Sequence, residues 1–508
     1  MKKVWAVPVI AAAMCIGLAA CAPSGGGTID QKGANVFPVS TTEDSLDITM
    51  GDVMPFYDNG VMNIYHLRNS SGTNSRFYHP IARITTSDFI HYTDEGVALD
   101  FEEDVTSVDA ALGTGSFIKD SSTGVYHCFY TGHNDSGQDE GLKYNEVVRH
   151  ATSTDGQKTW VKDEDFNLYG WENDFRDPYV YYDSTDSCYY MLITTRDSGK
   201  AVIKRYSAKT LDATAEEWDK GYVDNFFTNE EGSYNMECPS FVELNGFYYL
   251  AYSEQSDTNR VTHYRYKTSH DGEWQKFDRD SIDNTGFYAG RLEKAGDKLY
   301  AFAWCARLAG GTSGGFDWGG NLVTHELVQN SQTGELSAVM PHNYKDYFKT
   351  QINYNTVSGE KVSSFEFDGE AFGAHGVEKL SSNVMRMSMT IQANGDKGDF
   401  GLSFGLDGNY NNRLGSAIIA FELEKNSVTC YNGVSSILRY GAPLAKVAFD
   451  FEKDKSYDAD VIIDGEVITV YLNGEVALTA RITDMKGANF AFYSNGAKAK
   501  IQDVKIYE

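Results

Sequence analysis

The stretch "FRDPYVYYDSTDSCYYMLITT", residues 175–195, contains two aromatic, strand-like runs separated by a polar turn at residues 183–187. Aromatic and β-branched residues favour strands, and turn residues between two such runs indicate a β-hairpin. The first run opens with Arg176, Asp177 and Pro178, although an Asp-Pro pair alone is usually only a turn signal. The stretch therefore predicts a hairpin with an acidic side chain at the start of its first strand.

The same hairpin pattern occurs five times along the chain. The second strands of these hairpins read "GVMNIYHL" from Gly60, "GVYHCFYTG" from Gly124, "SCYYMLITT" from Ser187, "GFYYLAYS" from Gly246 and "DKLYAFAW" from Asp297. Their starts are about 64, 63, 59 and 51 residues apart, and such intervals fit four-stranded propeller blades with long loops. We therefore expect a five-bladed β-propeller over residues 46–342.

The pattern changes after a connector at residues 343–354. Short alternating strands surround the turns Asp464-Gly465 and Asn473-Gly474, and Asp-Gly and Asn-Gly are the strongest short-range hairpin signals. Residues 355–508 are therefore predicted to form a β-sandwich. The fold class is all-β. The sandwich shows no concentrated aromatic platform, so we expect it to brace the propeller rather than to bind polysaccharide.

The N-terminus reads as a targeting segment. Lys2 and Lys3 precede an apolar run from Val4 to Leu18, and the sequence Leu18-Ala19-Ala20-Cys21 resembles a bacterial lipobox. The run is shorter than the roughly 20 residues of a spanning helix. Residues 1–21 are therefore predicted to be a lipoprotein signal peptide with lipidation at Cys21, and residues 22–45 a flexible tether. An ordinary signal peptide is the alternative. The expected location is a bacterial cell surface, facing outward, with membrane contact only through the lipid.

The composition narrows the class of ligand. The net charge of −28 repels phosphate, which argues against nucleic acid as a partner and leaves neutral substrates open. Acidic surface also keeps a large protein soluble. Five widely spaced cysteines follow Cys21, and an odd number inside apolar runs does not suggest disulfides. We expect buried free thiols at Cys128, Cys188, Cys238, Cys305 and Cys430.

Three of the five first strands open with a carboxylate: Asp52, Asp177 and Glu237. They lie about 8, 10 and 9 residues before their hairpin partners, so we expect equivalent places in three blades and convergence on one axial pocket. Clustered acids shift one another's pKa values and are costly unless used. Glycoside cleavage uses such a set directly, because one carboxylate attacks or activates water while another donates a proton to the leaving oxygen.

These motifs resemble glycoside hydrolase family 32, the β-fructofuranosidases that include invertases, inulinases and levanases. The resemblance rests on Arg176-Asp177-Pro178, Glu237-Cys238-Pro239 and the early Asp52, with support from "FYTG" at residues 129–132 and "WGGNLVTHELV" from Trp318. It covers nearly the whole mature chain. It implies a five-bladed propeller followed by a β-sandwich, in agreement with the architecture predicted from the repeats.

The resemblance also implies roles for the acids. Asp52 matches the nucleophile, Glu237 the general acid and base, and Asp177 the transition-state stabiliser that binds fructose hydroxyls. Retention of configuration implies carboxylates about 5 to 5.5 Å apart at Asp52 and Glu237. Arg176 is expected to lie beside these acids, to contribute to substrate binding and to keep Asp177 ionised. Around the nucleophile this chain departs from the family's Asn-Asp-Pro-Asn-Gly and reads "GDVMP". The family's first strand often closes with a Tyr-Gln pair, whereas the same region here reads Tyr65-His66-Leu67. Both departures bear on substrate choice.

Further residues are candidates for sugar contact. Ser116 and Thr114 carry hydroxyls at the corresponding place in the second blade, and Tyr288, Trp318 and Trp171 could stack on sugar rings, although aromatic residues at blade edges often belong to the core. No cofactor is expected. No metal site is expected either, because the cluster of His127, Cys128 and His133 lies on alternating faces of a strand and offers no tight ligand set.

The sequence thus predicts a retaining glycosidase that releases fructose units from sucrose, fructo-oligosaccharides, inulin or levan. Three alternatives remain open. A family 43-like arabinan or xylan hydrolase has the same order of acids but inverts configuration, with carboxylates roughly 6.5 to 9.5 Å apart. A fructosyltransferase is not separated from a hydrolase by sequence. A non-catalytic carbohydrate-binding lipoprotein would not need all three acids. The oligomeric state is left open.

Overall fold

The structure is a computed structural model, and the residues that it describes are 27–28, 36–39, 48–70, 79–135, 141–171, 174–255, 260–309, 315–359, 361–369, 372–378, 380, 384–406, 414–432, 442–482 and 489–508. The predicted signal segment 1–21, its lipidation residue Cys21 and most of the predicted tether lie outside the described residues. Nothing in the structure therefore bears on the predicted anchor.

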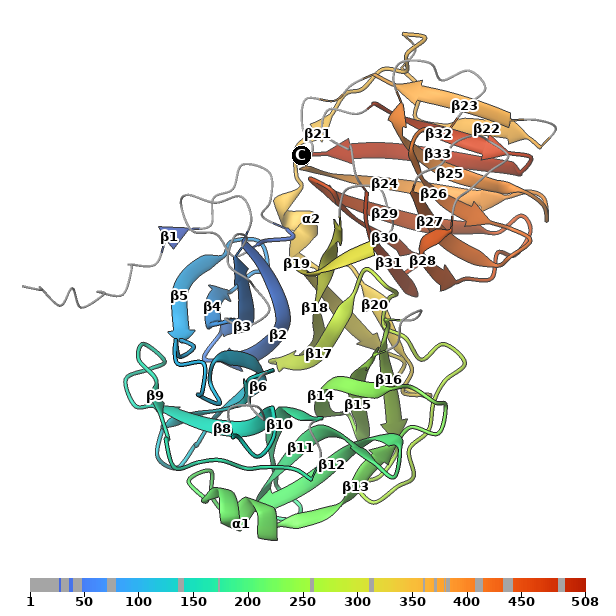
Figure 1. The fold of residues 1–508 in the computed structure, drawn as a ribbon. Helices are drawn as coiled ribbons and strands as arrows, with labels where there is room; N and C mark the ends of the chain where they lie inside the picture. Colours follow the sequence, from blue (N-terminus) through green and yellow to red (C-terminus); the bar gives the residue numbers. More distant parts are fainter. Residues whose placement is uncertain are drawn as a thin grey trace, which may run out of the picture.

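The first two thirds of the chain form four sheets around a common centre (Figure 1). A nine-stranded sheet comprises β1 (Gly27–Thr28), β5 (Thr93–Leu99), β4 (Ile81–Thr86), β3 (Val61–Ser70), β2 (Ile48–Asp58), β19 (Gly315–Gln329), β18 (Lys298–Ala309) and β17 (Tyr288–Ala295) in that order, with β20 (Leu336–Val339) beside β19. A four-stranded sheet comprises β6 (Ala111–Lys119), β7 (Tyr126–His133), β8 (Glu146–Ser153) and β9 (Val161–Lys162).

The other two sheets follow the same order of strands along the chain. One comprises β10 (Phe175–Asp183), β11 (Cys188–Asp197), β12 (Lys200–Ala208) and β13 (Tyr222–Thr228). The next comprises β14 (Asn235–Leu244), β15 (Phe247–Gln255) and β16 (Thr262–Lys267). In the nine-stranded sheet a single residue pair, Gly320 with Met50, joins β19 to β2.

All five hairpins predicted from the sequence are present as antiparallel pairs, namely β2 with β3, β6 with β7, β10 with β11, β14 with β15 and β17 with β18. Their first strands contact one another in a closed cycle, β2 with β6, β6 with β10, β10 with β14, β14 with β17, and β17 with β2. The starts of these five strands therefore surround one central space.

Helix contributes little to the described residues. The short helix α1 (Ala215–Lys220) has a capping box, in which the Thr214 side chain accepts from Glu217 N and the Glu217 carboxylate accepts from Thr214 N at 2.8 Å. The second helix, α2 (Asn343–Tyr347), lies between the two parts of the molecule (Figure 1). In the part of the chain that the structure describes, no helix has the length and apolar character required to span a bilayer.

The C-terminal part consists of two packed sheets. One comprises β21 (Gln351–Ile352), β33 (Lys498–Tyr507), β24 (Val384–Ala393), β29 (Ser456–Asp464), β30 (Val467–Leu472) and β31 (Val476–Arg481), with β22 (Phe365–Asp368) beside β33. The other comprises β23 (Phe372–Val377), β32 (Asn489–Asn495), β25 (Asp399–Leu406), β26 (Ala417–Glu422), β27 (Ser427–Asn432) and β28 (Pro443–Ala448). Inward-facing apolar side chains of both sheets fill the core between them. Strand β21 lies within the predicted connector 343–354 and pairs with β33.

The two parts share a packed and hydrogen-bonded boundary. His325 of β19 contacts Asp283 Oδ2 at 2.9 Å through Nε2 and the Tyr471 hydroxyl of the sandwich at 3.0 Å through Nδ1. The Arg481 guanidinium donates through Nε to Ala306 O at 2.7 Å and through Nη2 to Cys305 O at 3.0 Å. Because His325 and Asp283 are fully buried, these polar contacts fix how the sandwich is seated.

A segment of the predicted tether is part of this boundary. Val36 and Phe37 are buried, and their backbone N–H groups donate to Asp464 Oδ2 at 3.1 and 3.3 Å. Leu322 N donates to Pro38 O at 2.9 Å. Residues 36–39 therefore run between β19 and the sandwich instead of extending away from the folded body.

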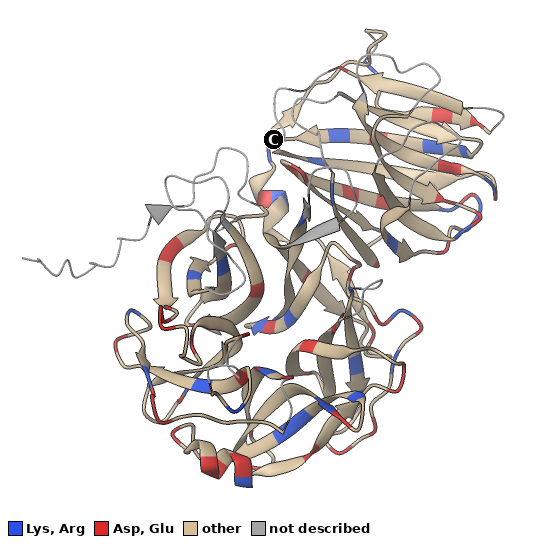
Figure 2. Ribbon diagram, viewed as in Figure 1, with Lys and Arg blue, Asp and Glu red and all other residues tan. Residues whose placement is uncertain are grey.

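Charged side chains are distributed over both parts of the molecule. Figure 2 shows acidic residues on strands and loops of the propeller-like part and of the sandwich, with basic residues among them. This distribution agrees with the interpretation of the net charge of −28 as an aid to solubility.

Candidate active site

Each of the five first strands is interrupted by a bulge near its start. The pairing shifts between Gly51 and Met54, Gly113 and Gly115, Arg176 and Tyr179, Glu237 and Ser240, and Tyr288 and Arg291. In four strands the residue that enters the bulge has a left-handed backbone: Asp52 (φ 41°), Asp177 (58°), Cys238 (54°) and Ala289 (55°). Non-glycine residues rarely adopt this conformation, and those that do are often found at active sites.

The bulges place the three acids in two different registers. Asp52 and Asp177 occupy the left-handed position, as predicted. Glu237 lies one residue earlier, at the position of Arg176 and Tyr288, and Cys238 takes the left-handed position instead. The prediction that all three acids occupy equivalent places is therefore wrong for Glu237. The reason is the extra residue of the bulge, which turns consecutive side chains into the same space.

The three acids nevertheless line one pocket, with a volume of about 210 Å³. The other residues that line it are Leu67, His79, Ala111, Leu112, Gly113, Thr114, Thr131, His133, Glu146, Arg176, Cys238 and Trp318. The predicted convergence of Asp52, Asp177 and Glu237 on a single cavity is thus a feature of the structure.

Both carboxylate oxygens of Asp52 accept hydrogen bonds. Thr114 Oγ1 donates to Oδ2 at 3.0 Å, and Trp304 Nε1 donates to Oδ1 at 3.1 Å. Burial nevertheless raises the pKa of Asp52 to about 6, and the Glu237 charge adds to the rise, while the two hydrogen bonds and Arg291 lower it. Asp52 is therefore oriented by two donors and gains its charge close to neutral pH.

Asp177 is tied to both neighbouring sheets. Its backbone N–H donates to Thr131 Oγ1 at 3.0 Å, and its Oδ2 accepts from Cys238 N at 2.9 Å. Burial raises the pKa of Asp177 to about 7 against the lowering effect of Arg176, and the charges of Glu237 and Asp52 raise it further. Arg176 thus favours the ionised form of Asp177, as expected, but desolvation outweighs the guanidinium and keeps the pKa above its ordinary value.

Arg176 pairs with other acids. Its Nη2 lies 2.9 Å from Glu237 Oε1, and its Nη1 lies 2.8 Å from Asp174 Oδ1 and 3.4 Å from Glu146 Oε2. The Tyr288 hydroxyl donates to the second oxygen of Glu237. Both oxygens of Glu237 are thus held by side chains from the two neighbouring first strands, β10 and β17.

The predicted sugar-binding residues differ in how they are placed relative to the pocket. Arg176, Trp318 and Thr114 line the pocket. Tyr288 reaches it through Glu237 and packs with Trp304 and Trp318. Ser116 is not among the lining residues; its buried hydroxyl accepts from Val180 N at 2.9 Å and so joins β6 to β10. The substrate-binding role predicted for Ser116 is therefore not supported, because its side chain faces the neighbouring strand.

Several pocket residues were not predicted to have a role at the site. Glu146 accepts from Phe175 N at 2.9 Å and pairs with Arg176. Arg176 and His133 lower the pKa of Glu146 although burial acts to raise it. Trp304 belongs to the predicted strand "DKLYAFAW", and Thr131 to the quoted "FYTG". Neither segment reveals that Trp304 Nε1 donates to Asp52 or that Thr131 Oγ1 accepts from Asp177 N in the neighbouring sheet.

The histidines and cysteines follow the prediction. His127 Nδ1 contacts His150 Nε2 at 3.0 Å in a buried pair, whereas His133 faces Asp135 and Glu146, so these histidines do not share a site. Cys128, Cys188, Cys238, Cys305 and Cys430 are free and buried. Burial raises the pKa of the Cys238 thiol, which supports its interpretation as a packing residue.

Three carboxyl groups converge on a small pocket at the centre of an all-β scaffold, and glycosidases use such a set to cleave glycosidic bonds. Comparison with known families places the chain more narrowly. Residues 53–318 match the glycosyl hydrolases family 32 N-terminal domain, and residues 343–508 match the glycosyl hydrolases family 32 C-terminal domain. The chain belongs to glycosyl hydrolase family 32, and it is a glycosidase that hydrolyses O-glycosyl bonds and releases fructose from fructosides.

Individual relatives agree with this membership. A levanbiose-producing levanase of Geobacillus stearothermophilus is 25% identical over 325 residues, which cover 56% of this chain and 74% of the levanase. The solved exo-inulinase of Aspergillus awamori superposes with a TM-score of 0.70 at 15% sequence identity. The match covers 94% of this chain and 98% of the inulinase. The β-fructofuranosidase of Bombyx mori has a TM-score of 0.67 at 17% identity, with coverages of 90% and 91%. These structures share the fold, and they support the combination of a β-propeller with a β-sandwich.

Proposed function

We propose that this glycosidase acts by a retaining mechanism, with Asp52 as nucleophile, Glu237 as general acid and base, and Asp177 as the group that holds the sugar. The observation that carries the proposal is the convergence of these three carboxyl groups on one pocket of about 210 Å³. Asp52 attacks the anomeric carbon while Glu237 donates its proton to the leaving oxygen. Glu237 then deprotonates a water molecule, which attacks the fructosyl ester and releases fructose and free Asp52.

The contacts of each acid suit its role. Two hydrogen bonds orient the Asp52 carboxylate for in-line attack. Arg176 and Tyr288 hold the two oxygens of Glu237, so its proton is delivered from a fixed place. Asp177, whose pKa is raised to about 7, can both donate to and accept from sugar hydroxyls near neutral pH.

The pocket favours action on chain ends. Its volume of about 210 Å³ is below the roughly 300–1,000 Å³ typical of sites for larger ligands. We propose that it holds one terminal fructosyl unit and that sucrose, fructo-oligosaccharides, inulin or levan supply it. Fructose as the first product from inulin and levan would support this proposal, and early release of longer oligosaccharides would contradict it.

We also propose five blades for the propeller. The closed cycle of contacts among the five first strands supports this number. In this interpretation the nine-stranded sheet contains the first and the last blade, which are linked into one sheet by the residue pair of Gly320 with Met50.

The anchor and location remain proposals that rest on the sequence. Lys2, Lys3 and the lipobox-like Leu18-Ala19-Ala20-Cys21 support lipidation at Cys21 and an outward-facing position on a bacterial cell surface. Metabolic labelling with a fatty acid should mark the intact chain and fail to mark Cys21→Ser. Equal labelling of both would contradict the proposal.

The catalytic assignment is tested with Glu237→Gln and Asp52→Asn, using the chain from residue 22 onward. Each should bind fructose oligosaccharide while turnover falls by at least about 10²–10⁴-fold, the usual contribution of acid–base groups. An activated fructoside should trap an ester on Asp52 in the Glu237→Gln variant, and peptide mapping locates it. An adduct on another residue, or a product of inverted configuration, would contradict the mechanism.

Hydrolysis and fructosyl transfer are separated in the same assay. The ratio of fructose to glucose released from sucrose is one for pure hydrolysis and falls when fructose is transferred to a second sugar. We expect a ratio close to one at low sucrose concentration.

A further inference from the structure

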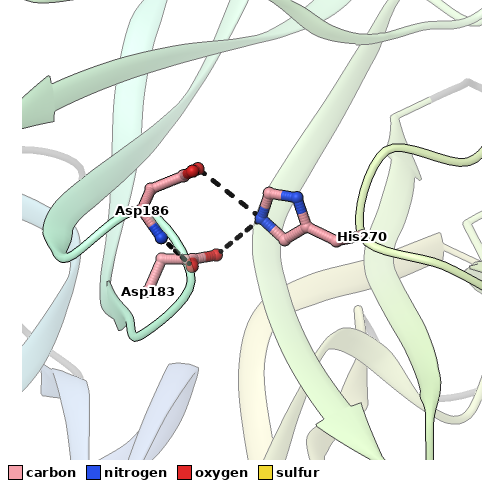
Figure 3. Close-up of side chains that lie close together, drawn as sticks. All are labelled: Asp183, Asp186 and His270. Carbon is pink, nitrogen blue, oxygen red and sulfur yellow. Dashed lines mark hydrogen bonds and ion pairs between the residues drawn. The ribbon is translucent and has the colours of Figure 1, made fainter.

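A second cluster of ligating side chains lies away from the catalytic pocket. Asp183 ends β10, Asp186 lies in the turn between β10 and β11, and His270 comes from the loop after β16 (Figure 3). The ligating atoms of these three residues all lie within 4.8 Å of one another. Asp183 stands six residues after Asp177 on β10, which corresponds to about 20 Å of strand. The cluster therefore lies at the opposite end of the sheets from the three catalytic acids.

Both carboxylates converge on one nitrogen atom. His270 Nε2 lies 3.0 Å from Asp183 Oδ2 and 3.6 Å from Asp186 Oδ2. Zinc binds nitrogen and carboxylate oxygen at about 2.0–2.2 Å in tetrahedral geometry, which separates neighbouring ligand atoms by about 3.4 Å. The two observed separations lie on either side of this value. Two of the three ligand separations are therefore close to the value for a tetrahedral ion, and the Asp183 and Asp186 oxygens lie within 4.8 Å of each other. Asp186 Oδ2 also accepts from the Tyr190 hydroxyl at 2.6 Å, which holds this oxygen in place.

Other histidine–carboxylate contacts in the described residues lack this convergence. His133 faces Asp135 through Nε2 and Glu146 through Nδ1. His263 likewise uses Nδ1 for Asp280 and Nε2 for Glu254. In both cases the two carboxylates lie on opposite sides of the ring and cannot share one ion with it. His270 differs because two carboxylates meet at the same nitrogen.

The surroundings hold these ligands in place. Asp271 Oδ1 lies 2.7 Å from His270 Nδ1, which is the carboxylate–histidine–metal arrangement that fixes the ring and its tautomer. Asp183 Oδ1 accepts from the backbone N–H groups of Thr185 at 2.8 Å and Asp186 at 3.1 Å, so Oδ2 is left to face His270. A pocket of about 310 Å³ borders Asp183 and His270 and leaves room for a water ligand.

We propose that Asp183, Asp186 and His270 form a binding site for a divalent transition metal, with zinc as the ion that fits best. One imidazole and two carboxylates suit zinc, whereas a nitrogen ligand disfavours calcium. The ion would join the turn of the β10–β11 hairpin to the loop that follows β16, and so tie together two neighbouring sheets. Its role would be structural, because the cluster lies far from the catalytic acids.

A protonated His270 that donates to both carboxylates is the competing explanation. The two are distinguished by calorimetric titration of the chelator-treated chain with Zn²⁺ alone. We expect one strong site and release of a proton when the ion binds, because the metal replaces the proton on Nε2. His270→Gln and Asp183→Asn should each weaken this binding by at least about 10–100-fold. His91→Gln is the matched control, because His91 Nδ1 pairs with Asp88 at 2.7 Å in a histidine–carboxylate contact outside the cluster.

Visible absorption and melting temperature test metal binding independently of the variants, which matters if a variant folds poorly. Co²⁺ added to the intact chain should give the visible absorption of a four-coordinate site, and Zn²⁺ should abolish it. Zn²⁺ should also raise the melting temperature of the parent chain and of His91→Gln, but not that of His270→Gln. Absence of Zn²⁺ binding to the parent chain, binding unchanged in both cluster variants, or preference for Ca²⁺ over Zn²⁺ would overturn the proposal.

Discussion

Arg176 and Glu237 occupy the same position in adjacent sheets, one residue before the bulge of β10 and of β14, and their side chains meet at 2.9 Å. Arg176 also holds Asp174 at 2.8 Å. A planar guanidinium with several fixed donors can serve both acids at once, which a lysine ammonium cannot do in the same geometry. The position of Glu237 in the pocket therefore depends on the planar guanidinium group of Arg176.

Replacement of Arg176 by lysine keeps the positive charge but removes the planar guanidinium, whose donors contact Glu237 and Asp174 at the same time. We expect Arg176→Lys to lower kcat by about 100-fold, as is typical of a misplaced catalytic group. Steady-state kinetics with sucrose or inulin measures the effect. Arg386→Lys is the control, because Arg386 forms an ion pair of 2.7 Å with Asp460 in the sandwich. A fall of similar size in the control, or none in Arg176→Lys, would contradict this reasoning.

The hydroxyl of Thr114 stabilises ionised Asp52 through a hydrogen bond of 3.0 Å. Thr114→Val removes this bond and should raise the pKa of Asp52 above about 6. Because the nucleophile must be ionised, the acid limb of kcat/KM should then move to higher pH, by about 0.5–1 unit. Profiles of kcat/KM against pH test this. Thr85→Val, which removes a hydroxyl bound to Glu95, should leave the profile in place; a shift of the acid limb to lower pH in Thr114→Val would refute the assignment.

Tyr288 donates its hydroxyl to Glu237. Tyr288→Phe retains the ring that packs beside Trp304 but frees one oxygen of the acid. We expect kcat to fall by about 10-fold with little change in KM, since a positioning hydrogen bond to a charged group contributes about 1.5–3 kcal/mol at most. An equal rise in KM with constant kcat would indicate a role in substrate binding instead.

The buried contact between His325 and Tyr471 joins the two parts of the molecule at 3.0 Å. Tyr471→Phe leaves His325 Nδ1 without this partner, so the free energy of unfolding should fall by about 1–3 kcal/mol. Urea unfolding measures the loss. Tyr222→Phe is the control, because Tyr222 is 41% exposed and its hydroxyl contributes little. No difference between the two variants would show that the boundary does not depend on this hydrogen bond.

Asp464 carries a pH-dependent cost to stability. Burial raises its folded pKa to about 7, above the ordinary value of 3.8, against the lowering effect of the hydrogen bonds from Phe37 and Val36. Its Oδ1 is buried without a hydrogen-bond partner among the described residues. Between these two pKa values the folded state binds more protons than the unfolded state. Stability from this group is therefore greatest at low pH and declines as the pH rises towards 7.

Asp464→Asn should remove this dependence. The neutral amide can still accept from Val36 N and Phe37 N, so the variant should gain stability relative to the parent at pH 8 but not at pH 4. The gain is up to about 4 kcal/mol, the full value of a three-unit shift. Melting temperatures at the two pH values measure it, and a variant that is destabilised equally at both would contradict the prediction.

The local signals of the sequence predicted the hairpins well. Aromatic strands and their turns lie within about twenty residues of one another, so all five hairpins and the turn at Asp183–Ser187 could be read directly. The position of Glu237 relative to the bulge could not be predicted, because the number of residues between Glu237 and its hairpin turn does not reveal a bulge. The same limit explains why Ser116 was predicted to contact sugar together with Thr114: only Gly115 lies between them in the sequence, but the Ser116 hydroxyl joins a neighbouring strand.

Contacts between segments that are far apart in the chain could not be predicted from the sequence. Trp304 and Asp52 are 252 residues apart, and Asp183 and His270 are 87 residues apart. Only the closure of the sheets brings them together. For the same reason, spacing along the sequence groups neighbours such as His127 and His133, but it does not bring Asp183 and Asp186 together with His270.

The recurrent bulge has an evolutionary consequence. The same kink holds an aspartate in two strands, a cysteine in a third and an alanine in a fourth, so the backbone geometry does not depend on the side chain that it presents. Side chains at these positions still contact the neighbouring hairpins, as Arg176 contacts Glu237. A change of substrate or of chemistry can therefore keep the backbone frame, but each replacement also alters the contacts of the next hairpin.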